Sequence, residues 1–294
     1  MLNVKRLMLN VKLKYSLKSI SMKHLFALIL SVLIYASAAA AQVDTLDIFS
    51  PSMYKTSRCI VILPENYTIK GDKYPVLYLL HGWSGSYAGW LGEAPQLKKH
   101  ADQYQMIIVC PDGGYDSWYL DSPVDSTVRY DTYISKELVA YIDYYYHTQP
   151  EKSGRAIAGL SMGGHGAITL AAKHPDVFGA AGSMCGGLDL RPFKKNDWDL
   201  EGVLGKPSQN WDNWEAVSAI NMVPMLQKSA IPLIIDCGTG DFFLEVNRAM
   251  HQSLLEAKVA HEYTERPGEH NRDYWSNAVD FQVLFFDKFF RQQK

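Results

Sequence analysis

The chain has 294 residues, enough for one large domain or two small ones with a sizeable buried core. Its hydrophobic content of 47% and charged content of 20% are ordinary for a soluble globular protein. The net charge is −2, and no basic stripe follows the N-terminus, which argues against a nucleic-acid partner. These features favour a globular protein whose chemistry must be read from its motifs.

The N-terminal segment has the layout of a secretory signal. Basic residues between Lys5 and Lys23 precede an apolar run over 25–41 that ends in three alanines and a glutamine. The pattern predicts a signal peptide over 1–41, cleaved after Ala41, and a secreted or periplasmic mature protein. After cleavage we expect no stable association with a membrane.

Two further readings of this segment remain open. Met-Leu-Asn-Val-Lys occurs at 1–5 and again at 8–12, which indicates a misassigned start with Met22 as the better initiator. The apolar run of 17 residues is also at the short edge for an uncleaved membrane anchor. The signal peptide is the favoured interpretation.

The four cysteines give no sign of a metal site in the sequence. They stand far apart, with no Cys-x-x-Cys pair and no metal-ligand spacing with histidine. We therefore expect no metal and no cofactor, and interpret the cysteines as buried free thiols. They are Cys59, Cys110, Cys185 and Cys237.

Eight segments have the apolar or alternating pattern of β-strands, and amphipathic helical patterns lie between them. The predicted strands are 43–49, 57–63, 74–80, 105–110, 155–159, 178–184, 231–237 and 259–265. The predicted helices are 95–104, 130–146, 162–173, a helix after Gly240, and 274–290. This alternation predicts an α/β fold, with an eight-stranded, mostly parallel sheet covered by helices on both faces. We expect residues 42–294 to form one domain.

A segment at about 186–229 is too long for an ordinary connection and contains short helical patterns. Trp198, Trp211 and Trp214 lie within it. Long insertions near the carboxyl ends of strands often cover a site. A packed surface insertion is an equal alternative.

The pentapeptide Gly-Leu-Ser-Met-Gly at 159–163 follows a strand pattern and begins a small-residue helix. This arrangement is typical of a nucleophile elbow, a sharp strand-to-helix turn that exposes a serine in a strained backbone conformation. The sequence therefore predicts Ser161 as a nucleophile.

A serine nucleophile needs a base and an acid that orients the base. His270 follows the last predicted strand in a Pro-Gly loop, and Asp241 follows the seventh strand. The order Ser161, Asp241, His270 is the one expected for this sheet type. Two alternatives to the acid remain: Asp241 as a helix N-cap only, and Asp236, which lies within the seventh strand.

The tetrahedral intermediate also needs preorganised N–H donors, an oxyanion hole. We expect these donors to be the backbone N–H groups of Met162, after the nucleophile, and Trp83, after the third strand. His81 and His165 are interpreted as structural.

These motifs resemble the α/β-hydrolase superfamily and, within it, the esterase D-like family. That family includes S-formylglutathione hydrolases, tributyrin, acetyl and feruloyl esterases, and mycolyltransferases. The similarity extends from Ser57 to the C-terminus. It rests on Tyr-Pro-Val-Leu-Tyr-Leu-Leu-His-Gly at 74–82 with Trp90 following, Gly-Leu-Ser-Met-Gly-Gly at 159–164, Cys-Gly-Thr-Gly-Asp at 237–241 and Pro-Gly-Glu-His at 267–270.

The resemblance implies Ser161 as nucleophile, Asp241 as acid, His270 as base, and the N–H groups of Trp83 and Met162 as oxyanion donors. The predicted export favours a secreted carboxylesterase acting on acetyl or feruloyl esters of plant polysaccharides. Alternatives are an acyltransferase with the same triad, a thioesterase similar to S-formylglutathione hydrolase, and, remotely, a non-catalytic carbohydrate-binding protein.

Aromatic residues provide candidates for a substrate wall. Trp118, Tyr119 and Trp214 are the residues that we expect to contact a phenolic acyl group or the face of a sugar. The alternative is that these aromatic residues belong to the core and its rim. The partner expected from these interpretations is an ester substrate, such as an acylated polysaccharide or oligosaccharide.

Overall fold

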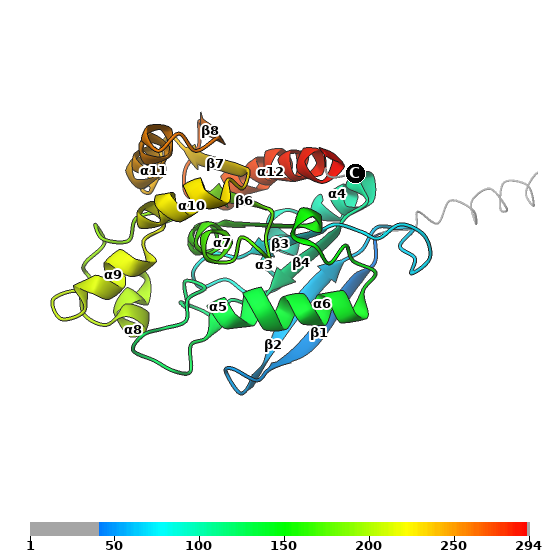
Figure 1. The fold of residues 1–294 in the computed structure, drawn as a ribbon, viewed down its shortest axis with the longest axis horizontal. Helices are drawn as coiled ribbons and strands as arrows, with labels where there is room; N and C mark the ends of the chain where they lie inside the picture. The colour runs from blue at the N-terminus through cyan, green and yellow to red at the C-terminus, as the bar shows by residue number, and fades with distance from the viewer. Residues whose placement is uncertain (1–40, 293–294) are drawn as a thin grey trace, which may run out of the picture. The chain divides into compact units, whose positions relative to one another are not determined.

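A computed structural model describes residues 41–292. The predicted signal segment therefore lies almost wholly outside the described residues. The described chain contains an eight-stranded sheet in the order β1-β2-β4-β3-β5-β6-β7-β8 (Figure 1). The strands are β1 (Val43–Ser50), β2 (Lys55–Ile62), β3 (Val76–Leu80), β4 (Ile107–Pro111), β5 (Arg155–Leu160), β6 (Ala180–Met184), β7 (Leu233–Gly238) and β8 (His261–Arg266).

The sheet is mostly parallel, as predicted. β2 pairs antiparallel with β1 and β4, whereas every pairing from β4 through to β8 is parallel. All eight predicted strands are present, and their ends differ from the prediction by at most a few residues. The fold prediction is confirmed.

Helices occupy the predicted positions, with some additions. They are α3 (Gly89–Glu93), α4 (Leu97–Tyr104), α5 (Tyr130–Thr132), α6 (Val139–Tyr145), α7 (Met162–Lys173), α8 (Leu200–Leu204), α9 (Trp211–Val217), α10 (Val223–Ser229), α11 (Leu244–Glu256) and α12 (Arg272–Gln292). The predicted helix at 130–146 is present, but its middle, Tyr133–Leu138, is π-helical. Helix α3 has no counterpart in the prediction.

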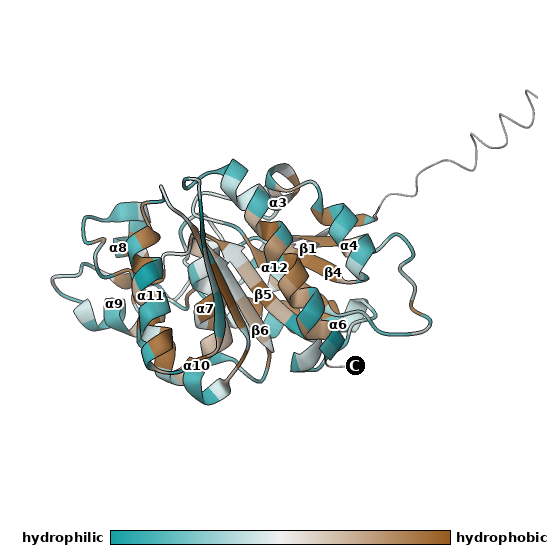
Figure 2. Cartoon of the chain, turned by 90° about the horizontal axis from the view of Figure 1, so that it is seen from above, coloured by the Kyte–Doolittle hydropathy of each residue, from teal (hydrophilic) through white to brown (hydrophobic). Residues whose placement is uncertain are grey.

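Helices cover both faces of the sheet because the strands present apolar side chains on both sides. In β3, Tyr78 and Leu80 belong to a core cluster shared with α6 and α7, whereas Leu77 and Leu79 belong to one shared with α4 and α12. Figure 2 shows the apolar residues concentrated on the strands and on the helix surfaces that face them.

The insertion at 186–229 folds into the short helices α8, α9 and α10. Figure 1 shows α8 and α9 at the end of the molecule opposite α4. Hydrogen bonds connect the insertion to helices α7 and α11. The Nε2 atom of His165 in α7 lies 2.9 Å from the carbonyl oxygen of Val217, and Nδ2 of Asn247 in α11 donates to the carbonyl oxygen of Gly186 at 2.8 Å.

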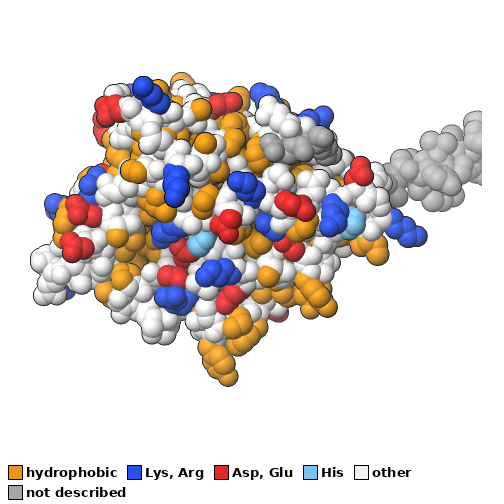
Figure 3. Space-filling model, in the orientation of Figure 1, with side chains coloured by type: hydrophobic (Ala, Val, Ile, Leu, Met, Phe, Trp, Pro, Cys, Tyr) orange, Lys and Arg blue, Asp and Glu red, His pale blue; other side chains and the backbone are white. Residues whose placement is uncertain are grey.

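The surface in Figure 3 carries lysine and arginine side chains interspersed with aspartate and glutamate side chains, and no separate basic stripe is visible on that face. None of the helices within residues 41–292 combines the length and the apolar character that crossing a bilayer requires.

Helix α7 approaches the strands closely because glycines line the contact. A Cβ atom on Gly163 would lie 2.4 Å from the carbonyl oxygen of Leu80, and one on Gly159 would lie 2.4 Å from the carbonyl carbon of Gly163. Backbone atoms on either side cannot move aside as a flexible side chain could. Glycine at these positions therefore sets where the turn between β5 and α7 sits.

We predict that Gly163→Ala lowers the free energy of unfolding by about 1–3 kcal/mol, because the added methyl group meets backbone oxygens. The matched control is Gly202→Ala in α8, where an added Cβ has no neighbour within 4 Å. That variant should be neutral or more stable by up to about 1 kcal/mol, since alanine favours helix. Urea unfolding of both variants measures the difference; equal losses of stability would contradict the close-approach explanation.

Candidate active site

Ser161 lies at the turn between β5 and α7, with φ 54° and ψ −118°. A non-glycine residue seldom adopts this conformation, and such strain is concentrated at functional sites. The turn is held because the N–H of Ser161 donates to the carbonyl oxygen of Met184 in β6 at 2.9 Å, and the N–H of His165 donates to the carbonyl oxygen of Ser161 at 3.1 Å. The serine is 8% exposed, so it is almost covered by its surroundings.

His270 lies in the loop between β8 and α12 and joins the other two predicted residues. Its Nε2 atom is 2.8 Å from Oγ of Ser161, and its Nδ1 atom is 2.7 Å from Oδ2 of Asp241. An ionised carboxylate only accepts hydrogen bonds, so Nδ1 carries the proton and donates it to Asp241. Nε2 is then the unprotonated nitrogen, placed to accept from the Ser161 hydroxyl.

The surroundings of His270 act in opposite directions on its pKa. Burial lowers the pKa, whereas the hydrogen bond to Asp241 and the neighbouring Cys185 thiol raise it, and the net direction is upward from the usual value. The aspartate therefore stabilises the imidazolium form that a general base becomes after accepting a proton.

Asp241 uses its two oxygens for two different tasks. Oδ2 accepts from His270, while Oδ1 accepts from the N–H of Phe243 at 2.7 Å, just before α11 begins. The Asp241 side chain is fully buried. The N-cap interpretation of Asp241 is wrong, because Phe243 is the N-cap residue of α11; the bond from the Phe243 N–H closes a turn that precedes the helix.

The rival acid, Asp236, faces a different set of residues. It accepts hydrogen bonds from Nε2 of Gln282 at 2.8 Å and from the hydroxyl of Tyr274 at 3.1 Å, both in α12. Its Oδ1 atom is 3.7 Å from an Nη1 atom of Arg266. Burial raises the pKa of Asp236 to about 6 against the opposing effect of these donors. Its carboxylate links β7 to α12 and does not bond to His270.

His81 and His165 are structural histidines in this site. His81 Nδ1 donates to the carbonyl oxygen of Gly82, and its Nε2 accepts from the N–H of Gly113, both at 2.8 Å. These bonds fix the loop after β3 against the loop after β4. Burial lowers the pKa of both histidines, that of His165 to about 4, so both remain neutral near pH 7.

The two predicted oxyanion donors lie beside Ser161. Met162 is the first residue of α7, so its N–H has no partner within the helix. Trp83 follows Gly82, where a Cβ atom would lie 3.3 Å from Cβ of Ser161. The N–H of the next residue, Ser84, donates to the carbonyl oxygen of Tyr115 at 2.7 Å, which fixes the loop that carries the Trp83 N–H.

The predicted substrate wall is wrong for its three residues, because the structure places all of them in the core. Trp118, Tyr119 and Trp214 are 1%, 0% and 0% exposed. The Trp118 ring packs edge-on against His165, and the Tyr119 hydroxyl donates to the carbonyl oxygen of His81 at 3.1 Å. The Trp214 indole donates to the carbonyl oxygen of Gly205 at 3.0 Å.

Aromatic residues outside the three expected ones lie near the triad or on the loops that follow the strands, and Trp198 comes from the insertion that was expected to cover a site. Phe242 is 54% exposed, and its ring centroid is 4.2 Å from that of His270. Trp198, from the insertion, stacks on Phe242 at 5.5 Å. Trp83 packs against Tyr115, which is 56% exposed. A signal for these residues was present, because Phe242 and Tyr115 both stand in loops that follow the carboxyl ends of strands.

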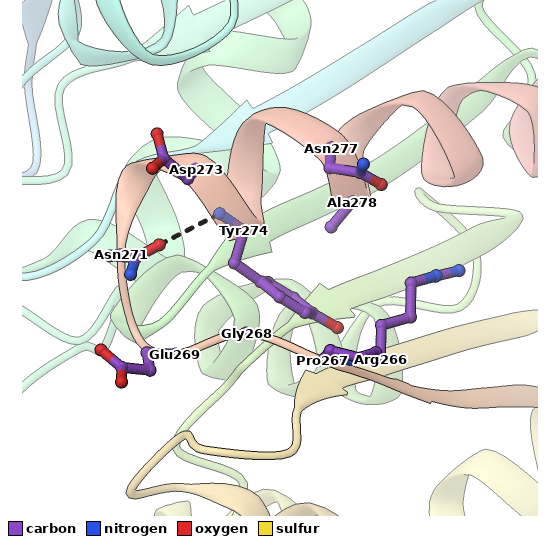
Figure 4. Close-up of a pocket in the computed structure, with 9 residues that line it drawn as sticks. All are labelled: Arg266, Pro267, Gly268, Glu269, Asn271, Asp273, Tyr274, Asn277 and Ala278. Carbon is purple, nitrogen blue, oxygen red and sulfur yellow. Dashed lines mark hydrogen bonds between the residues drawn. The ribbon is translucent and has the colours of Figure 1, made fainter.

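A cavity of about 570 Å³ lies beside the loop that carries His270 (Figure 4). Figure 4 shows the Tyr274 ring crossing it, with Arg266 and Asn277 at one end and Glu269 and Asn271 at the other. Neither Ser161 nor the other two residues bonded in the triad line this cavity. The candidate site is therefore defined by the triad and by the exposed ring of Phe242 beside His270, rather than by this cavity.

Comparison with known proteins identifies the family. Residues 50–286 match the sequence model of the esterase family, described as "Putative esterase". Esterase Rv1288 of Mycobacterium tuberculosis is 31% identical over 237 residues, covering 71% of this chain and 51% of the relative, so the chain spans about half the length of that protein. An acetyl esterase of Caldicellulosiruptor saccharolyticus is 22% identical over 259 residues, covering 80% of this chain and 94% of the relative.

The fold is also found among solved structures. A ferulic acid esterase superposes with a TM-score of 0.74 and 28% sequence identity, covering 85% of this chain and 98% of the other. The topology of the sheet, the turn at Ser161 and the match over most of the chain agree with one another. This chain has the α/β-hydrolase fold and belongs to the esterase family.

Proposed function

We propose that this protein is a serine carboxylesterase that cleaves carboxylic esters through an acyl-Ser161 intermediate. The observation that carries the proposal is the continuous pair of hydrogen bonds from Oγ of Ser161 to His270 at 2.8 Å and from His270 to Asp241 at 2.7 Å. Those distances fall within the range in which a base can take the proton of a nucleophile.

The first half of the reaction forms the acyl-enzyme. Nε2 of His270 takes the proton of Ser161 as Oγ attacks the carbonyl carbon of the ester. The N–H groups of Trp83 and Met162 hold the resulting oxyanion, each contributing about 3–4 kcal/mol to lowering the barrier. When the tetrahedral intermediate collapses, the ester C–O bond breaks, and His270 gives its proton to the departing alkoxide to form the alcohol.

The second half repeats these steps with water. His270 takes a proton from the water molecule as its oxygen attacks the acyl carbon, and the same N–H donors hold the second oxyanion. Collapse breaks the bond to Oγ, and His270 returns the proton to Ser161. The acid product leaves, and the enzyme is regenerated with all protons balanced.

Three features support acetyl or feruloyl esters of plant polysaccharides as the substrate class. The exposed rings of Phe242 and Tyr115 offer apolar faces on which a phenolic acyl group or a sugar can pack. Two similar proteins carry the names acetyl esterase and ferulic acid esterase, which refer to these two kinds of ester. The secretory layout of residues 1–41 supports export to the compartment where such polysaccharides occur.

Replacing the nucleophile tests the mechanism. We predict that Ser161→Ala lowers kcat for nitrophenyl acetate by about 10⁴-fold or more, because no acyl-enzyme can form. Labelling by a fluorophosphonate probe should disappear in the same variant. Its thermal unfolding should match that of the wild type, and activity within a few-fold of the wild type would disprove the proposal.

Asp236, in β7, and Asp241, in the loop that follows β7, provide a matched pair of variants. We predict that Asp241→Asn lowers kcat by about 10⁴-fold, because an amide no longer selects the tautomer of His270 that accepts from Ser161. Asp236→Asn should keep kcat within a few-fold, since Asp236 bonds to α12 and not to His270. A loss of kcat in Asp236→Asn as large as that in Asp241→Asn would refute this assignment.

The aromatic surface is tested by selectivity. We predict that Phe242→Ala raises KM for methyl ferulate about fivefold relative to KM for nitrophenyl acetate, since an aromatic pair contributes about 1 kcal/mol. Phe49→Ala is the control, because Phe49 is similarly exposed at 53% but lies in β1 at the opposite edge of the sheet. An unchanged ratio of the two KM values in Phe242→Ala would show that this ring does not bind the acyl group.

A further inference from the structure

Two buried thiols lie next to the triad, although their cysteines are far apart in the sequence. The parallel register of β6 and β7 pairs Met184 with Asp236, which brings the residues that follow them, Cys185 and Cys237, side by side. The N–H of Cys185 donates to the carbonyl oxygen of Asp236 at 2.8 Å and continues this pairing. Both thiols are unpaired and fully buried.

The triad carboxylate completes a group of three ligand atoms. The Sγ atoms of Cys185 and Cys237 and a carboxylate oxygen of Asp241 all lie within 4.8 Å of one another. His270 lies next to this group, because its Nδ1 atom is 2.7 Å from Oδ2 of Asp241.

These three side chains match the donors that soft divalent cations prefer. Zinc-type sites have cysteine, histidine and aspartate ligands in a tetrahedron, either four from the protein or three with water in the fourth position, and metal–sulfur distances of about 2.3 Å. Two sulfur ligands of one such ion lie about 3.8 Å apart, a spacing that follows from this metal–sulfur distance and tetrahedral angles. The upper limit of 4.8 Å on the separation of the ligand atoms therefore exceeds this spacing by about one ångström.

We propose that Cys185, Cys237 and Asp241 form an inhibitory site for a soft divalent cation such as Cd²⁺ or Zn²⁺. The metal site itself depends only on the geometry of these three residues. The inhibition that it causes rests on the esterase function proposed above.

Inhibition follows from the proton positions and needs no obstruction of Ser161. Each bound cation displaces one proton from each of the two thiols, so two protons are released for two positive charges gained. Coordination occupies the Asp241 carboxylate, which otherwise accepts the hydrogen bond from Nδ1 of His270 and so holds the proton on that nitrogen. Without this acceptor, the imidazole is no longer held in the tautomer whose Nε2 accepts from Ser161.

The experiment titrates purified protein with Cd²⁺ and follows two signals. One is the ultraviolet sulfur-to-cadmium charge-transfer band, and the other is hydrolysis of nitrophenyl acetate. In the wild type we expect the band to appear and activity to fall over the same Cd²⁺ range, with a chelator reversing both. Cys185→Ser and Cys237→Ser should each weaken the band and raise the Cd²⁺ concentration for half-inhibition by about tenfold or more, as expected for loss of a ligand.

Cys110→Ser is the matched control, because Cys110 is an equally buried thiol in β4. It should leave the band and the inhibition unchanged. Cys185→Ala and Cys237→Ala repeat the test if a serine variant fails to fold. A wild type without the band, or a band that survives replacement of both cysteines, would overturn the site; a band without any loss of hydrolysis would overturn the inhibition. Because the band does not require activity, its presence in a protein that hydrolyses no ester would uphold the site while refuting the proposed function.

Discussion

The close contact of helix α7 with the ends of β3 and β5 determines where the nucleophile lies. Gly159 and Gly163 leave no side chain between the backbones, and the turn between them forces Ser161 to φ 54°. The strained conformation is maintained because hydrogen bonds from β6 and α7 fix the peptide groups on both sides. The serine hydroxyl is thus directed outward by the packing of the sheet, before any interaction with histidine is considered.

The rest of the site depends on parallel strands that end at one edge of the sheet. β5, β7 and β8 deliver Ser161, Asp241 and His270 from three separate parts of the chain, and their spacing follows from strand pairing. Asp241 couples this arrangement to α11, because one oxygen orients His270 while the other accepts from the N–H of Phe243. A change that displaced the start of α11 would therefore also disturb the base.

The sequence alone was sufficient to predict the features that local residue patterns determine. Strands buried on both faces appear as short apolar runs, and the elbow at Ser161 has a glycine spacing that few other structures require. The direction of aromatic side chains has no such local signature. Trp118 and Tyr119 both adopt left-handed backbone conformations, with φ 52° and 58°, and the Tyr119 ring packs against Gly113 and Gly166. Only the folded backbone reveals that these rings turn inward, while the ring of Phe242 is exposed beside His270.

The proximity of the two cysteines could not be predicted from the sequence, for a related reason. Spacing in the sequence can reveal ligands on one turn or one helix, but Cys185 and Cys237 meet only through the pairing of β6 with β7. The parallel pairing of β7 with β8 brings the loop with Asp241 next to the loop with His270, and the carboxylate lies close to the two thiols. Burial raises the pKa of the Cys185 thiol, which keeps it protonated and uncharged beside the carboxylate in the absence of a cation. While the Cys185 thiol is neutral, the charge of the Asp241 carboxylate interacts with His270. A cation that replaced the thiol proton would instead attract the Asp241 carboxylate. The geometry that makes the base effective is thus the geometry that exposes it to soft metals.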